Sequence, residues 1–159
     1  ERDPFPVTGW DAVVWSVGNA TQAASFFQAT YGMELHAYSG PETGNRDHHA
    51  FVLCSGAVRF VLKGGVDPRS PLIDHHRRHG DGIVDIALEV PDVDRCIGHA
   101  RAQGATVVEE PHDLLDEHGT VRLAAIAVLC RPVQLRPFAY RLDAFGIAFS
   151  VCRVFAPIT

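Results

Sequence analysis

The chain has 159 residues, of which 47% are hydrophobic and 21% are charged, a size that suits one compact domain or a pair of fused small modules. Its formal net charge is −5 and its pI is about 6.0, so it lacks the basic surface typical of proteins that bind nucleic acid or an anionic membrane. No apolar run reaches about 18 residues and no basic segment precedes an apolar one, from which we expect a cytoplasmic protein.

The four cysteines lie far apart and include no C-x-x-C pair; they are Cys54, Cys96, Cys130 and Cys152. This spacing is typical neither of a zinc cluster nor of a small disulfide scaffold. We interpret them as reduced and mostly buried apolar residues.

The first unit in chain order is a strand followed by a helix. Asp11–Gly18 is rich in β-branched and aromatic residues, which predicts a strand. Asn19 with Gln22 three residues later is the pattern of a helix N-terminus, and Gly32 stands where a glycine would end that helix. Between these signals one apolar face repeats at helical spacing, formed by Ala20, Ala23, Ala24, Phe27 and Tyr31.

A second unit repeats this order. Asp85–Val90 predicts a strand, Asp92 predicts a helix N-cap, and Gly104 predicts the end of that helix. The apolar stripe of this second helix consists of Val93, Cys96, Ile97 and Ala100. The two units are offset by 74 residues at the aspartates that open the strands and by 72 residues at the closing glycines. We infer an internal duplication.

Further strands are predicted after each helix. The first helix is followed by Glu34–Ser39, His49–Cys54 and Ala57–Lys63, the last two joined by a hairpin at Ser55-Gly56. The second helix is followed by Ala105–Glu109 and Thr120–Leu129, and a final strand is expected within residues 131–159. Each unit is therefore β-α-β-β-β in outline, which predicts an α+β fold.

Several segments together resemble one protein family. They are Val17-Gly18-Asn19-Ala20, Ala37–Gly44, Arg59–Leu62, His79–Ala87 and Asp116–Gly119. In order and with short gaps, from about Asp3 to about Ala127, the chain resembles the N-terminal half of the 4-hydroxyphenylpyruvate dioxygenases. The related 4-hydroxymandelate synthases share the segment that begins H-G-D-G.

This resemblance implies the vicinal-oxygen-chelate fold, which is shared with glyoxalases and consists of two βαβββ modules forming a curved mixed sheet. We expect a dioxygenase-like N-terminal domain at residues 1–127. Its first module would span about residues 9–66 and its second about residues 83–127 and beyond, leaving residues 128–159 as a divergent tail.

The resemblance also implies a chemistry. The family converts 4-hydroxyphenylpyruvate, an intermediate of tyrosine breakdown, to homogentisate with O₂ and Fe(II). Two histidines and a glutamate hold the iron and leave positions open for substrate and O₂. Because these ligands belong to the C-terminal half, Fe(II) is implied for the full-length family and no cofactor is expected for this chain. A homo-oligomer and a separate C-terminal catalytic half are the partners that we expect.

The two halves of these enzymes resemble each other, so positions equivalent to the iron ligands can be sought here. The first histidine would correspond to Ala12 and the second to Asp85, and the glutamate would fall on the last strand. Alanine carries no ligand atom, so Asp85 is at best a vestigial ligand position. The resemblance therefore predicts no catalytic, cofactor-binding or metal-binding residue in this chain.

One histidine cluster has a simpler interpretation than a metal site. His75, His76 and His79 include pairs at helical spacing that could bind a metal on a helix face. They lie beside Arg77 and Arg78 just before Gly80, however, and cations at the C-terminal end of a helix complement its dipole. We interpret the cluster as the polar end of a helix.

Other polar groups are also interpreted structurally. His48 and His49 beside Asp47 predict a loop-to-strand junction with one imidazole inward and solvent exposure. Asp85 lies inside an apolar strand, so we expect it to pair locally with an arginine or with backbone N–H groups. Gly80-Asp81-Gly82 predicts a tight turn, since it lacks the surroundings of a phosphate-binding loop.

Three functional hypotheses follow. The first is a truncated 4-hydroxyphenylpyruvate dioxygenase-like protein of aromatic amino acid catabolism that is inactive alone. The second is a non-enzymatic module for oligomerisation or for binding a small aromatic ligand in a cup. Aromatic residues that could line the cup, or instead form ordinary core, are Trp10, Trp15, Tyr38, Phe51 and Phe60. The third is a dimer that completes a metal site across chains, which Ala12 disfavours.

The tail differs in composition from the rest of the chain. Residues 128–159 contain four arginines, three prolines and one acidic residue, with apolar runs at Ala144–Ser150 and Val151–Phe155. Family members carry an H-T-L-V-[DE] strand here, whereas this chain has Val128–Gln134. A shifted reading frame in a GC-rich gene would produce such a change, and genuine divergence is the alternative.

Overall fold

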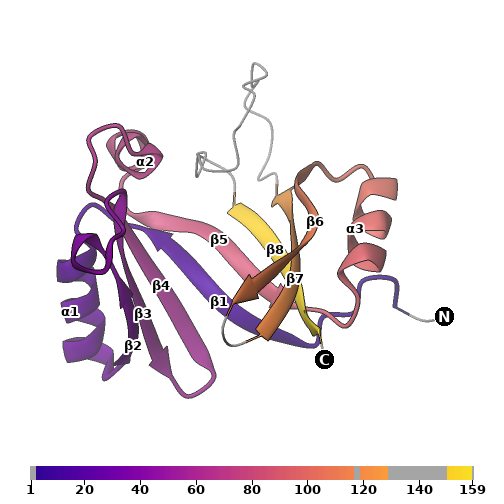
Figure 1. The fold of residues 1–159 in the computed structure, drawn as a ribbon, viewed down its shortest axis with the longest axis horizontal. Helices are drawn as coiled ribbons and strands as arrows, with labels where there is room; N and C mark the ends of the chain where they lie inside the picture. The colour runs from indigo at the N-terminus through magenta and orange to yellow at the C-terminus, as the bar shows by residue number, and fades with distance from the viewer. Residues whose placement is uncertain (1–2, 117–118, 129–149, 159) are drawn as a thin grey trace. The chain divides into compact units, whose positions relative to one another are not determined.

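The computed structural model describes residues 3–116, 119–128 and 150–158. The chain divides into two compact units, which we call the first module, Ala12–Val84, and the second module, which begins at Asp85 and also includes the residues up to Asp11. Each module contributes its own set of strands and a helix packed on them (Figure 1).

The first module contains four strands that form a mixed sheet in the order β2-β3-β4-β1. Along the chain its main elements are β1 (Gly9–Ser16), α1 (Ala20–Tyr31), β2 (Glu34–Ser39), β3 (His48–Ser55) and β4 (Val58–Gly65). β1 and β4 run parallel, and the other neighbours are antiparallel. A short 3₁₀ helix, η1 (Pro41–Thr43), follows β2, and a second α-helix, α2 (Pro71–His79), follows β4.

The second module repeats this topology. Its elements are β5 (Gly82–Glu89), α3 (Val93–Ala102), β6 (Val107–Asp116), β7 (Gly119–Val128) and β8 (Ser150–Ile158). They give the strand order β6-β7-β8-β5, with β5 and β8 parallel and the other pairs antiparallel. α1 packs on β2, β3 and β4 just as α3 packs on β6, β7 and β8 (Figure 1). The structure thus confirms the βαβββ duplication predicted from the sequence.

The two main helices begin at the predicted capping residues. The Asn19 side chain accepts a hydrogen bond from the Gln22 backbone N–H at 3.0 Å, and the Asp92 side chain accepts one from the Arg95 backbone N–H at 3.0 Å. Each bond satisfies a backbone donor that has no partner inside the first helical turn. α1 ends at Gly32, whose φ of 65° places it in the left-handed region that favours glycine.

Each module has a separate hydrophobic core. The core of the first consists of Val17, Ala20, Ala24, Met33, Leu53 and Leu62, with Trp15, Phe27, Phe51 and Phe60 packed against it. The core of the second is largely aliphatic and consists of Val90, Val93, Cys96, Ile97 and Ala124, with Phe5, Leu88, Val107 and Ile126 around it. Burial of these side chains is the main force that holds each helix on its sheet.

Two strand boundaries differ from the predictions. β6 continues to Asp116 although the sequence predicts its end at Glu109, because Pro111 is tolerated in an edge strand whose pairing is irregular between Glu109 and His112. The first hairpin turns at Gly56-Ala57, one residue later than predicted, with Gly56 at a φ of 57°. β8 begins at Ser150, inside the segment expected to hold the last strand.

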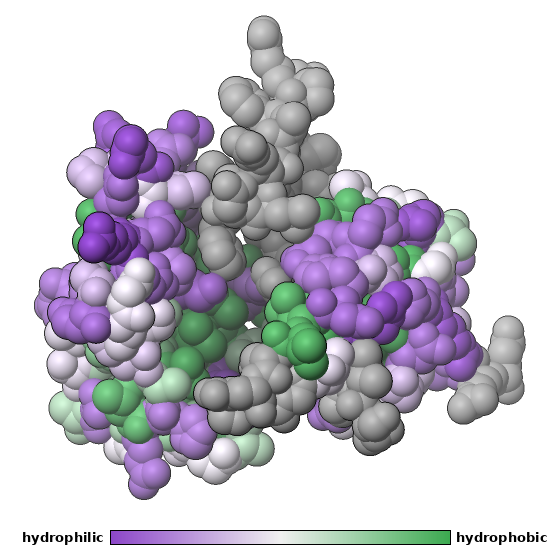
Figure 2. All heavy atoms as spheres, viewed as in Figure 1, coloured by the Kyte–Doolittle hydropathy of each residue, from purple (hydrophilic) through white to green (hydrophobic). Residues whose placement is uncertain are grey.

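The helices of the described residues are too short, or too polar, to cross a membrane. Figure 2 shows that the outward surface around α2 is mostly hydrophilic. This agrees with the exposure of Arg77, Arg78 and His79 on that helix.

Candidate functional site

The two positions singled out by the family resemblance occupy the same place in the duplicated fold. Ala12 is the fourth residue of β1 and Asp85 is the fourth residue of β5, two strands of eight residues each. Both side chains are buried, with exposed fractions of 7% for Ala12 and 2% for Asp85. The topology therefore supports treating them as equivalent positions of the repeat.

These residues do not fit an iron centre of the type that the resemblance implies. A 2-His-1-carboxylate site needs a nitrogen or oxygen donor at each ligand position, and the methyl group of Ala12 supplies none. The third position falls on the last strand, where side chains lie outside the described part of the structure. Among the residues that are described, no group of three or more His, Cys, Asp or Glu side chains gathers as a metal site.

Asp85 is a buried carboxylate within an apolar strand. Between Val84 and Ile86 it is enclosed by protein, and it takes part in a polar or electrostatic interaction. A buried acid requires such an interaction, because an isolated carboxylate is costly to remove from water. That the interaction is with an arginine or with backbone N–H groups stays a prediction.

The histidine cluster lies at the end of α2, as predicted, but one member is not polar surface. His75 has an exposed fraction of only 6%, so it is buried although it belongs to the cluster interpreted as the polar end of a helix. The helix turns its Leu72 face inward, and His75 lies on the same side. Burial lowers the pKa of the His75 imidazole, the charges of His79 and His76 lower it further, and Asp74 opposes them.

His76 and Asp81 join α2 to the segment between β1 and α1. The carboxylate of Asp81 accepts a hydrogen bond from the Gly18 backbone N–H at 2.8 Å, and its Oδ1 lies 3.1 Å from Nδ1 of His76. The second contact is an ion pair at close range whose groups are not aligned for a hydrogen bond. The sequence identified the Gly80–Gly82 turn but gave no signal that Asp81 reaches Gly18, 63 residues away in the chain.

A second polar group connects β2, η1 and β3. The Tyr38 hydroxyl donates to Glu42 at 2.6 Å and lies 2.8 Å from Nδ1 of His49. Because the single phenol proton points to Glu42, His49 is the donor in its contact with Tyr38. The hydrogen bond raises the pKa of Tyr38 and lowers that of Glu42. This network holds the β2–β3 connection in place.

His48 and His49 are both half-buried, so the expected exposure of this pair is wrong. His48 lies 3.0 Å from Asp47 and 3.3 Å from the amide of Asn45, while His49 stacks against Tyr38. The two rings have separate partners and do not converge on one ligand. Pairing with neighbours replaces the water contacts predicted for a junction.

The aromatic residues suggested for a ligand cup are not grouped as one lining. Trp15, Phe51 and Phe60 pack against the core beneath α1, with the Trp15 and Phe60 ring centres 5.8 Å apart. Tyr38 belongs to the polar network above, and Trp10 is 68% exposed. For the three core residues, the ordinary core interpretation is therefore correct.

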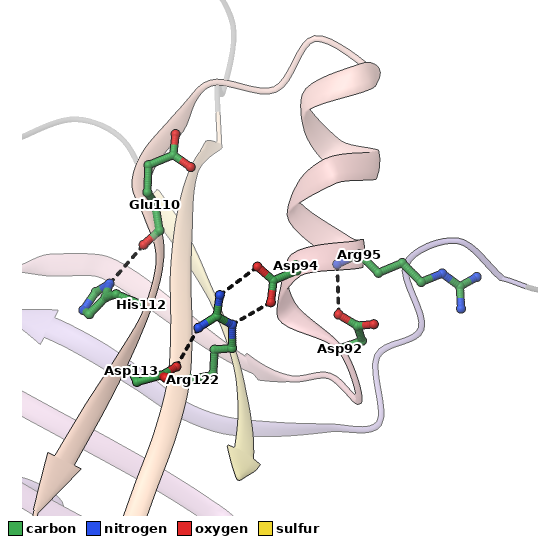
Figure 3. A network of polar contacts seen from close by, with 7 residues as sticks. All are labelled: Asp92, Asp94, Arg95, Glu110, His112, Asp113 and Arg122. Carbon is green, nitrogen blue, oxygen red and sulfur yellow. Dashed lines mark hydrogen bonds and ion pairs between the residues drawn. The ribbon is translucent and has the colours of Figure 1, made fainter.

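An ion-pair network of the second module joins α3 to the two strands of the β6–β7 hairpin. Figure 3 shows Arg122 of β7 between Asp94 of α3 and Asp113 of β6. Its guanidinium donates to both carboxylate oxygens of Asp94 at 2.6 and 2.8 Å and to Asp113 at 2.6 Å. This fork geometry is favourable for a carboxylate, and it lowers the pKa of Asp94. The network therefore holds α3 against β6 and β7.

Two cysteines fall within the described side chains. Cys96 is buried in the core of the second module and Cys54 is half-buried on β3, and both are free thiols. This agrees with the prediction for these two residues. The side chains of Cys130 and Cys152 lie outside the described part.

Comparison with known proteins identifies the class to which this fold belongs. Residues 11–121 match the Glyoxalase/Bleomycin resistance protein/Dioxygenase superfamily. The chain belongs to this superfamily, and its paired βαβββ modules are the α+β vicinal-oxygen-chelate fold expected from the sequence.

Within that class the chain is similar to 4-hydroxyphenylpyruvate dioxygenases. It is 42% identical over 119 residues to the enzyme of Dictyostelium discoideum, covering 74% of this chain and 32% of that protein. It is 41% identical over 123 residues to the enzyme of Yarrowia lipolytica, covering 75% of this chain and 31% of that protein. The chain thus spans about a third of the length of these curated relatives.

Solved structures show the same fold at lower sequence identity. A variant of 4-hydroxymandelate synthase from Streptomyces coelicolor is 23% identical with a TM-score of 0.74, covering 97% of this chain and 43% of that one. Methylmalonyl-CoA epimerase from Mycobacterium tuberculosis is 20% identical with a TM-score of 0.66, covering 100% of this chain and 94% of that one.

Proposed function

We propose that this chain is the structural, non-catalytic N-terminal part of a 4-hydroxyphenylpyruvate dioxygenase-like protein of tyrosine catabolism. The observation that carries the proposal is the pair of equivalent positions, Ala12 on β1 and Asp85 on β5. To hold Fe(II) in the way implied for the catalytic half of the family, this chain would need histidines at these two positions, and it has none there. The similarity to curated dioxygenases over three quarters of the chain supports the lineage.

An oxygen-uptake assay tests this function. The purified 159-residue chain would be supplied with Fe(II), ascorbate and 4-hydroxyphenylpyruvate, and a catalytically competent dioxygenase would serve as the positive control. We expect no oxygen uptake above that of free ferrous iron. Stoichiometric conversion of the substrate to homogentisate by the chain alone would overturn the proposal.

We also propose that the chain works in contact with a second chain, either another copy or a catalytic half. Leu114 and Leu115 on the edge strand β6 support this, since both are apolar and Leu115 is 80% exposed. Multi-angle light scattering would be expected to give at least twice the mass of one chain. A monomer that also fails to bind a separately expressed catalytic half would contradict the proposal.

Two further expectations belong to the same proposal. We propose a cytoplasmic location, which fractionation of the source cells would test. We also propose that residues 128–159 result from a shifted reading frame, which the downstream nucleotide sequence would test. If neither alternative frame after codon 127 encodes an H-T-L-V strand followed by an iron-binding half, genuine divergence is the correct account.

A further inference from the structure

α1 and α2 cover opposite faces of the sheet in the first module. A Cβ placed on Gly64 of β4 would lie 3.1 Å from Ala20 of α1, whereas a Cβ placed on Gly65 would lie 2.7 Å from Ile73 of α2. Neighbouring residues of a strand point to opposite faces, so the two helices lie on different sides of β4. Lys63 shares the α2-covered face with Gly65, and Ser16 of β1 is in register with Lys63.

Close backbone contacts hold α2 on this face. Ile73 approaches Gly65, and a Cβ on Gly18 would lie 2.5 Å from Nε2 of His76. Leu72 is buried beneath the helix, and Asp81 ties the following turn to the Gly18 backbone. The glycines at the ends of β1 and β4 therefore create the room in which α2 packs, as no other residue type would.

His75 is a buried polar residue in this packing whose ring is not fully hydrogen-bonded. Its side chain is more than nine-tenths buried, and its Nδ1 atom has no hydrogen-bond partner among the described residues. A neutral imidazole with its proton on Nε2 leaves Nδ1 as a bare acceptor, a modest cost. Protonation would place an unpaired N–H and a positive charge at the same buried atom, which is far more costly.

The charged groups around His75 do not offset that cost. On α2 its ring lies 5.0 Å from that of His79, and Asp74 is already paired with Arg78 at 2.9 Å. From β4, Lys63 points to the same face as Gly65 and is engaged in an interaction of its own. Asp81, in the turn after α2, is engaged by Gly18 and His76. The surroundings favour the neutral imidazole, in agreement with the lowered pKa of His75.

We propose that α2 is a pH-sensitive cover of this sheet face, which detaches from Gly18 and Gly65, at the ends of β1 and β4, when His75 takes up a proton. This inference is independent of the proposed dioxygenase lineage. His76 differs from His75, because it lies 3.1 Å from the carboxylate of Asp81, whereas Nδ1 of His75 has no partner among the described residues. Acid-induced release must therefore come from His75.

The change with pH in the ratio of detached to docked α2 follows from the linkage between proton uptake by His75 and detachment of the helix. In the detached state His75 would titrate near the ordinary histidine value of about 6.5, while in the docked state it remains neutral to lower pH. Between about pH 7.5 and 5.5 the ratio of detached to docked α2 would then rise by up to about tenfold. The stabilisation is complete above about pH 6.5 and is lost as the pH falls below it.

Amide hydrogen exchange of the full chain at these two pH values tests the proposal. After correction for intrinsic exchange, protection of the α2 amides should fall up to about tenfold in acid while that of the α1 amides stays constant. His75→Leu, which cannot take up a proton, should abolish the difference. His79→Gln, a change at the exposed histidine one turn away, should retain it.

A second variant and a direct titration keep the test decisive. If His75→Leu does not fold, His75→Gln serves the same purpose, and an NMR titration of the wild-type His75 ring should give a pKa below the ordinary histidine value of about 6.5. Equal α2 protection at both pH values would overturn the proposal. So would an undiminished acid response in the His75 variants, or a His75 ring that titrates at or above that ordinary value.

Discussion

The two modules have the same topology but different interiors. Both order their strands identically and begin their helix with a capping side chain, yet the first core is rich in aromatic rings and the second is mainly aliphatic. The first module also has α2 on the face of β4 opposite α1. In the second module, the ion pairs of Arg122 hold α3 on its strands. The two modules therefore share their strand order and helix caps, whereas their core residues and polar contacts differ.

The largest expected effect comes from truncating the two cores in parallel. Leu53→Ala in the first module and Ile97→Ala in the second each remove a fully buried aliphatic side chain. Each should lower the free energy of unfolding by about 2–5 kcal/mol, measured by chemical denaturation. Hydrogen exchange would show whether each loss stays within its own module. A cost below about 1 kcal/mol for either variant would contradict the separate cores.

Removing the equivalent helix caps should give a smaller, matched effect. Asn19→Ala and Asp92→Ala each delete one hydrogen bond to the first helical turn, and each should cost about 1 kcal/mol of unfolding free energy. Asn19→Asp and Asp92→Asn keep an acceptor and serve as controls that should remain close to wild type. The caps are not equivalent if one alanine variant is neutral in thermal or chemical denaturation.

One glycine in each module should respond to alanine substitution with an opposite change in stability. Gly98 lies inside α3 with open space around it, so Gly98→Ala should stabilise the protein by about 0.5–1 kcal/mol. Gly18→Ala should destabilise it, because the new methyl group would displace the His76 ring from its place beside Asp81. Melting temperatures that move in the same direction for both variants would contradict the close packing of α2.

The smallest effect concerns the Arg122 network of the second module. The guanidinium of Arg122 lowers the pKa of Asp94, so their stabilising contact is present above the ordinary aspartate value of about 3.9 and is lost as the pH falls below it. In Arg122→Gln the pKa of Asp94, followed by NMR, should rise toward that value. The pKa of Asp67, held at about 2 by Arg69 in the other module, should stay unchanged.

Local signals were enough to predict much of this fold. Capping residues, closing glycines and alternating apolar residues identify both helices and most strands, because each signal acts within a few residues. The predicted β6 is too short, because a proline such as Pro111 indicates the end of a strand in the interior of a sheet. β6 lies at an edge, where a proline is tolerated. The turn at Gly80–Gly82 was predictable from local residues, whereas its attachment to Gly18 before α1 was not, because it joins residues 63 positions apart.

The candidate site was predictable only in part, for a physical reason. Ala12 and Asp85 could be placed from the resemblance, and their matching positions in β1 and β5 agree with it. The burial of His75 was not predictable, because helical periodicity also placed it beside exposed arginines and only the packing of α2 decides which side faces inward. The packing of α2 on its sheet buries His75, and this burial is what makes it the proposed acid-sensitive group.

Iron binding is the measurement that tests the central claim most directly. Anaerobic equilibrium dialysis of the purified chain against Fe(II), followed by elemental analysis, would count metal ions per chain. Because Ala12 stands at the position equivalent to an iron ligand of the catalytic half and carries no ligand atom, we predict no stoichiometric retention of iron. One Fe(II) held per chain after dialysis, and lost on Asp85→Ala, would contradict the account of this chain as the structural part of a dioxygenase-like protein.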